Sequence, residues 1–202
     1  MKRALMGSVS NSVVRHAPAP VLVVRGDGRE EEVGRTLPGP VLLALDGSEE
    51  ARTAARAAVE VSNATDSGLH VLYVTEDVPL GPYAPYPGPE AWEVSEDALR
   101  ERKENARAFL RKEVEQIEAE GGAVEETHLA VGAPAKEIVR AGEELRAGMT
   151  VVGSRGLGAV GRTLMGSVSD SVVRHAHCPV LVVREEDAGA REGEKRERGL
   201  GR

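Results

Sequence analysis

The stretch VVGSRGLGAVGRTLMGSVSDSVVRHAHCPVLVVR, residues 151–184, combines a strand, a glycine-rich loop, a helix and a second strand. Both ends are short apolar runs rich in valine, as expected of strands that are buried on both faces. Residues 163–175 between them have the apolar spacing of a helix. A strand, a helix and a further strand joined by short connections indicate a parallel crossover unit. The stretch therefore predicts an α/β fold.

The alternation of strands and helices extends back towards the N-terminus. Earlier strands are expected at residues 41–46, 69–76 and 123–131. Helices, in which apolar side chains recur every three or four positions, are expected at residues 47–65, 95–120 and 135–146. This order favours a parallel sheet covered by helices on both faces. We interpret residues 40–184 as one complete domain.

Three segments depart from this pattern in composition. Residues 26–39 are rich in glycine and charge and are expected to form a linker. Residues 185–202 are mostly Glu, Arg and Gly, which predicts a disordered charged tail. Residues 77–92 hold five prolines and three of the chain's five aromatic residues. They form either a simple connector or a flap near the strand ends, where α/β proteins bind ligands.

The composition excludes several classes of partner. The 202 residues include 26 basic and 33 acidic side chains, and the net charge of −7 disfavours nucleic acids and anionic membranes. Aromatic residues, at 2%, are too few for a base-stacking platform. The single cysteine, Cys178, excludes an internal disulfide and fits a reducing cytoplasm. No apolar run approaches the roughly 18 residues of a membrane span. We expect a cytoplasmic protein.

The glycine-rich loop carries the strongest chemical signal. Gly153 and Gly156 lie where the chain leaves a strand, and Gly166 and Ser167 precede a helical stretch that includes Ser169. Backbone N–H groups and hydroxyls gathered at a helix start form an anion site, usually for polyphosphate. The spacing is neither a dinucleotide fingerprint nor a Walker A loop. Taken alone, these residues fit a flexible glycine-rich connector equally well.

The spacing Gly153-x2-Gly156-x9-Gly166-Ser167 resembles the ATP-binding signature of the universal stress protein family. Four further segments are similar to that family in the same order: LALDGSE (43–49), APAKEIVRAGEEL (133–145), VVGSRG (151–156) and HCPVLVVR (177–184). Gly148 departs from the pattern, because the family often has an acidic residue there. The resemblance covers residues 40–184 and implies a five-stranded parallel sheet of order 3-2-1-4-5 with helices on both faces. Such a fold is Rossmann-like and similar to the adenine nucleotide alpha hydrolases.

The same resemblance implies a set of ATP-binding residues. Asp46, at the end of the first strand, would lie near the nucleoside, and the backbone of Val74 would contact the adenine edge. Arg155 and Arg162 would add positive charge near the phosphates, and Mg²⁺ would accompany ATP as its counter-ion. The implied binding residues are Ala44, Leu45, Asp46, Val74, Val152, Gly153, Arg155, Gly156, Gly166, Ser167, Val168 and Ser169.

Several of these residues also have a purely structural interpretation. Asp46 could instead cap the helix that follows it, and Ser167 and Ser169 could also be caps. Of the five histidines, only His175 and His177 have a spacing typical of ligands. That pair ends a helix, where positive charge is favoured, so no metal site is expected.

No catalytic residue is predicted, because the glycine loop offers only Arg and Ser beside a γ-phosphate. The sequence therefore favours an ATP-binding stress-response switch or adaptor with at most slow hydrolysis. Two alternatives stay open. One is an interaction protein of the same fold that does not use nucleotide, and the other is a nucleotide-dependent enzyme acting on a small substrate.

Residues 5–25, LMGSVSNSVVRHAPAPVLVVR, repeat residues 164–184 with differences at three of twenty-one positions. Residues 1–25 therefore resemble the last helix and strand of a second stress-protein domain. Either the chain starts inside a tandem protein, or the fragment is a retained remnant. In the family, dimers commonly pair their last strands edge to edge. A retained remnant would form the same edge pairing within one chain, between residues 21–25 and 180–184. If the remnant does not pair in this way, two chains are expected to associate through the edge of the last strand.

Overall fold

The computed structural model describes residues 7–24, 36–75, 96–156 and 165–184. The segment 77–92, the tail 185–202 and most of the expected linker 26–39 lie outside these described residues. The predictions made for them therefore stay predictions. Among the described helices, none combines the length and apolar character needed to cross a lipid bilayer.

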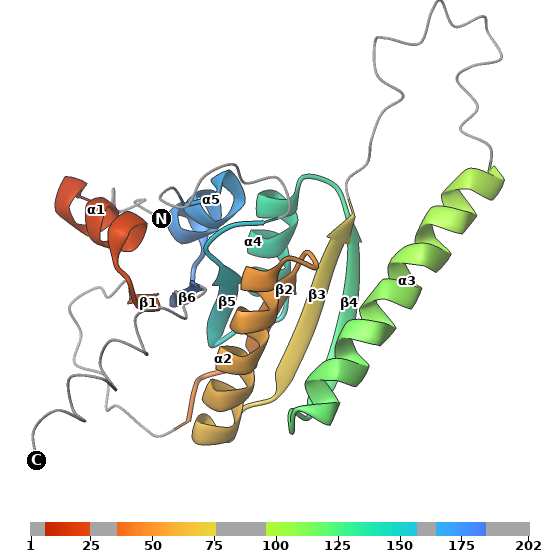
Figure 1. The fold of residues 1–202 in the computed structure, drawn as a ribbon, viewed down its shortest axis with the longest axis horizontal. Helices are drawn as coiled ribbons and strands as arrows, with labels where there is room; N and C mark the ends of the chain where they lie inside the picture. Colours follow the sequence, from red (N-terminus) through yellow and green to blue (C-terminus); the bar gives the residue numbers. More distant parts are fainter. Residues whose placement is uncertain (1–6, 25–35, 76–95, 157–164, 185–202) are drawn as a thin grey trace, which may run out of the picture.

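A twisted sheet runs through the middle of the molecule (Figure 1). Its strands are β1 (Val21–Val23), β2 (Val41–Leu45), β3 (Leu69–Thr75), β4 (Val124–Val131), β5 (Met149–Gly153) and β6 (Val180–Val183). They lie in the order β1-β6-β5-β2-β3-β4. The last five strands pair in parallel, which confirms the predicted order 3-2-1-4-5 for the domain.

In the described part of the chain the sheet has six strands, so the predicted count of five was too low. The sixth, β1, pairs antiparallel with β6 and places Val21, Leu22 and Val23 opposite Val182, Leu181 and Val180. This is the intrachain pairing that the sequence offered as one of two arrangements, although it is shorter than the predicted 21–25. A parallel domain leaves its last strand with unpaired N–H and C=O groups, and β1 satisfies them.

Four helices cover the two faces of the parallel sheet. They are α2 (Glu49–Thr65), α3 (Glu96–Ala119), α4 (Pro134–Glu144) and α5 (Ser167–His175). Residues of α2 and α3 pack with one set of strand side chains, and residues of α4 and α5 pack with the other set. Every residue of β2 and β5 is buried, because these strands lie inside the sheet and both of their faces are covered.

Helix α1 (Ser8–His16) lies beside α5 at the end of the sheet, and Val14 joins the core on the α4 and α5 side (Figure 1). The predicted bounds of two helices, α5 and α4, were wrong. Helix α5 begins at Ser167 rather than 163, since Gly166 is its extended N-cap with ψ 152°. Helix α4 spans Pro134–Glu144 rather than 135–146, since Arg146 has a positive φ of 50° that ends the helical turn.

Candidate functional site

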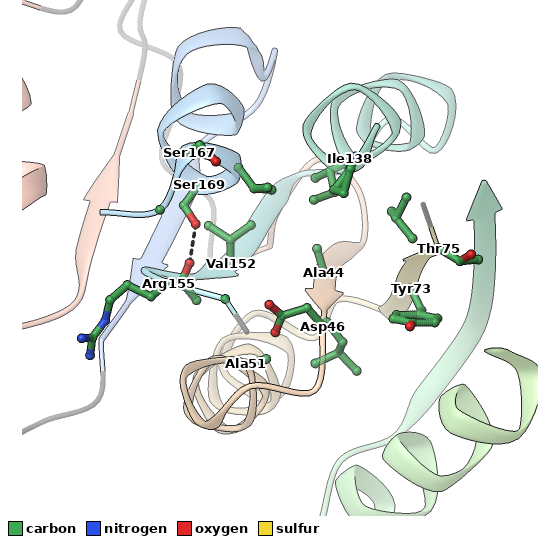
Figure 2. Close-up of a pocket in the computed structure, with 17 residues that line it drawn as sticks. Ala44, Asp46, Ala51, Tyr73, Thr75, Ile138, Val152, Arg155, Ser167 and Ser169 are labelled. Atoms are coloured by element: carbon green, nitrogen blue, oxygen red, sulfur yellow. Dashed lines mark hydrogen bonds between the residues drawn. The ribbon is translucent and has the colours of Figure 1, made fainter. Parts of the chain in front are cut away.

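A cavity of about 600 Å³ opens at the carboxyl ends of β2, β3 and β5. Strand β2 has β3 on one side and β5 on the other, so the sheet reverses its order at this point. Parallel sheets bind ligands in the crevice outside such a reversal. All twelve residues implied by the sequence line this one cavity (Figure 2). Five lining residues were not predicted: Ala51, Tyr73, Thr75, Pro134 and Ile138.

The wall of the cavity on the α4 side is apolar. Ala44 from β2, Val152 from β5 and Ile138 from α4 belong to one buried cluster, and Val74 packs against it. Ile138 lies on α4 and above Ala44 and Val152 in the view of Figure 2. A flat apolar ligand group would lose water on entering this region, which is the main favourable term in binding such groups.

Asp46 is the one acidic residue among the described residues that line the cavity, and its carboxylate lies in the cavity (Figure 2). Its Oδ1 accepts a hydrogen bond from the Ser48 backbone N–H at 3.0 Å. The cap of α2 is Ser48, whose Oγ accepts from the Ala51 N–H at 3.1 Å. Asp46 therefore orders the turn before the cap. A side chain on Gly156 would overlap the other carboxylate oxygen, so a larger residue there would displace the Asp46 side chain.

The start of α5 is held against the end of β5 by two hydrogen bonds. The Gly166 N–H donates to the Ser154 carbonyl at 2.8 Å, and the Ser169 hydroxyl donates to the Gly153 carbonyl at 2.6 Å. The N-cap of α5 is a glycine, so no side chain caps the first turn. The N-terminus of α5 is the positive end of the helix dipole. It lies at the rim of the cavity, which Gly166, Ser167 and Val168 line.

Arg155 lines the cavity, but its guanidinium extends away from Asp46 and the other polar side chains (Figure 2). Its Nη2 lies 2.5 Å from Glu50 Oε1. The side chain thus joins the loop after β5 to the first turn of α2. Arg162, the other arginine expected near phosphates, lies outside the described residues.

The five unpredicted lining residues come from strand ends and helix starts. Tyr73 and Thr75 flank Val74 on β3, and the Tyr73 ring packs on Phe109 of α3 with centroids 4.5 Å apart. Pro134 and Ile138 belong to the first turns of α4. Only their position along the sequence could have indicated them. A helix that follows a strand starts at the carboxyl end of that strand, which is the sheet edge where ligands bind. No local motif marked them.

The sequence model of the universal stress protein family matches residues 1–25 and 39–184. The chain is 32% identical over 152 residues to a universal stress protein of Methanocaldococcus jannaschii, covering 75% of this chain and 85% of the relative. It is 38% identical over 149 residues to a universal stress protein of Thermus aquaticus, covering 71% of this chain and 97% of the relative.

Solved structures share the same fold. A universal stress protein from Archaeoglobus fulgidus aligns with a TM-score of 0.62 and 31% identity, covering 91% of this chain and 57% of that chain. A universal stress protein in complex with cAMP aligns with a TM-score of 0.53 and 24% identity, covering 74% of this chain and 98% of that chain. At that lower identity the likeness shows the fold alone.

Proposed function

The chain belongs to the universal stress protein family, and we propose that its cavity binds ATP and that occupancy sets conformation or choice of partner. The observation that carries the proposal is the meeting of all twelve implied residues around one cavity at the reversal of the sheet. These residues come from three strands, one helix and the loops that adjoin them, so their meeting is a property of the fold rather than of a single motif.

The lining divides into parts that suit the parts of ATP. Ala44 and Val152 offer an apolar surface for adenine, and the backbone of Val74 lies at the strand end where the base edge would be read. Asp46 offers a carboxylate for a ribose hydroxyl. A cavity of about 600 Å³ falls within the usual range for ligands of this size.

The phosphates would lie against the loop after β5 and the start of α5. Gly166 leaves the backbone open to a close approach, and the uncapped first turn of α5 favours negative charge. With the Arg155 guanidinium held by Glu50, the recognition rests mainly on backbone amides. Mg²⁺ would be carried by the phosphates as their counter-ion.

A binding role is favoured over catalysis by the polar groups of the cavity. Asp46 is the only carboxylate among the described lining residues, and it already accepts the Ser48 N–H. It lies at the nucleoside end in this proposal, remote from a γ-phosphate. We therefore assign no catalytic residue and expect at most slow hydrolysis. The proposal includes a cytoplasmic location, where ATP is available.

Two experiments test this function. Denaturing the purified protein and identifying released nucleotide by mass spectrometry should give ATP or ADP. Calorimetric titration of nucleotide-free protein with Mg-ATP should give one site per chain, and cAMP serves as the competing adenine nucleotide. Protein that is empty and gives neither heat nor a thermal shift with Mg-ATP would favour the interaction protein that uses no nucleotide. Rapid turnover of bound ATP would favour the enzyme alternative.

A further inference from the structure

Two histidines that are far apart in the sequence meet near the other end of β3. Strand pairing places His70 of β3 opposite Glu126 of β4, and Leu72 opposite His128. The His70 and His128 rings lie with their centroids 5.2 Å apart. The pocket lining on β3 starts at Tyr73, whereas His70 is the second residue of the strand. The cluster is thus separate from the proposed nucleotide site.

Three possible ligand atoms of this cluster lie close together. His128 Nε2 is 3.1 Å from His70 Nδ1 and 3.5 Å from Glu126 Oε2, and the latter two atoms are 3.9 Å apart. A point equidistant from atoms with these separations lies roughly 2.1 Å from each, which matches Zn–N and Zn–O bond lengths. Two imidazoles and a carboxylate are also a common ligand set for zinc.

A bulge in β4 brings a second carboxylate to the same place. The register shifts between Leu69 and His70, which face Val124 and Glu126, so Glu125 is the extra residue. Glu125 Oε2 lies 3.8 Å from His70 Nε2, the ring nitrogen on the far side from His128. Bulges re-aim side chains near functional sites. A carboxylate behind a ligating histidine is the usual outer partner that orients the ring.

The two histidines are partly withdrawn from water. His70 is only 8% exposed, and His128 is half-buried. A neutral imidazole has the lone pair that a metal ion needs.

We propose that His70, Glu126 and His128 bind a divalent zinc ion, with Glu125 as the outer partner of His70 and the fourth position open to water. The ion would join β3 to β4, the last strand at this edge of the sheet. It would therefore fix an edge strand whose one neighbour among the described strands is β3.

Zinc binding to the purified full chain tests this proposal directly. After treatment with a chelator and its removal, titration with Zn²⁺ alone should show one site per chain. Substitution of Co²⁺ should give the visible absorption of a tetrahedral site. His128→Ala should weaken zinc binding at least 100-fold, and Glu125→Gln should weaken it about tenfold or more, as expected for an outer partner.

The matched control is the double variant His175→Ala with His177→Ala, because that pair has a ligand-like spacing but lies on the exposed end of α5. It should bind zinc as the natural chain does. Since His128 is half-buried, circular dichroism and Mg-ATP binding check that His128→Ala is folded. The proposal is overturned if the natural chain binds no zinc at micromolar concentration. It is also overturned if His128→Ala binds it equally well, or if the control variant loses it.

Discussion

Residues 5–25 and 164–184 are nearly the same sequence, and they fold into nearly the same local structure. Helices α1 and α5 have nine residues each, and their N-caps Gly7 and Gly166 have φ near −60° with extended ψ. Both helices lead into a short strand. Val14 and its equivalent Val173 are both buried in the same core cluster, but the surroundings differ at other positions. Local sequence therefore determines the helix and its ends, but not what the helix can bind.

The difference is clearest at equivalent side chains. Val172 is fully buried in the domain, whereas its equivalent Val13 is 52% exposed. Ser169 is buried and bonded to the Gly153 carbonyl, whereas Ser10 is exposed. A side chain on Gly7 would meet nothing within 4 Å. The second copy is part of a cavity because β2 and β5 stand beside it, whereas no such pair of strands stands beside the first copy among the described residues.

The two copies also contact each other in a nearly two-fold manner. Leu22 pairs with Leu181, which is its own equivalent in the repeat, so the strands are related as in a symmetric dimer. Arg15 of α1 lies 3.0 Å from Asp170 of α5, and Arg184 donates to the backbone carbonyls of Val14 and Arg15. The first copy thus acts as a partner for the edge of the sheet.

The largest expected effect comes from adding a negative charge to each copy in turn. Gly166→Asp should lower ATP affinity more than 100-fold, because the carboxylate would occupy the helix start in place of phosphate. Asp is a favoured N-cap, and a Cβ on Gly166 has only ordinary contacts, so the fold should persist. Calorimetry measures the affinity.

Gly7→Asp is the matched control and should bind ATP as the natural chain does. Gly166→Asn, which caps without charge, should retain more affinity than Gly166→Asp. Equal losses in the Gly7 and Gly166 variants would show that the two copies are not distinguished by their surroundings.

A smaller effect is expected in stability. Val172→Ala should lower the free energy of unfolding by about 2 kcal/mol, because it opens a cavity in a closed core. Val13→Ala should change it by less than about 0.5 kcal/mol, since that side chain is half exposed. Urea denaturation of both variants gives the two values. If Val13→Ala lowered the free energy of unfolding as much as Val172→Ala does, the side chain of Val13 would have to be covered in solution.

The smallest effect concerns Asp170, which is Asn11 in the first copy. Its hydrogen bond from Arg174, with a further contribution from Arg15, holds the pKa of this carboxyl below its ordinary value. Asp170→Asn should therefore cost roughly 0.5–1 kcal/mol at neutral pH. A carboxyl with a lowered pKa stabilises the fold above its unfolded pKa, so the difference should shrink below about pH 4. Denaturation at several pH values checks this, and a constant difference down to pH 2 contradicts it.

The sequence predicted a parallel sheet covered by helices because alternating strands and helices leave periodic patterns. The strand order and the twelve lining residues were instead implied by the resemblance to the family, and in the structure this order brings Asp46, Gly153 and Gly166 together. Ile138 and Tyr73 were not predicted as lining residues, because their positions depend on how α4 and the end of β3 are oriented relative to the cavity.

The histidine cluster was missed for a different reason. In the sequence only His175 and His177 have the short spacing of ligands, whereas His70 and His128 are brought together by strand pairing. The position of β1 was open for a similar reason, because either another chain or this chain itself could pair with the edge of β6. Long-range pairing cannot be derived from local spacing.

The most direct test uses the repeat as its own control in one sample. In nuclear magnetic resonance spectra of ¹⁵N-labelled protein titrated with Mg-ATP, the backbone amides of Gly166, Ser167, Val168 and Ser169 should shift. Those of Gly7, Ser8, Val9 and Ser10, which have the same local sequence, should not. Shifts of equal size in both copies, or in neither, would contradict the assignment of the nucleotide site to the second copy.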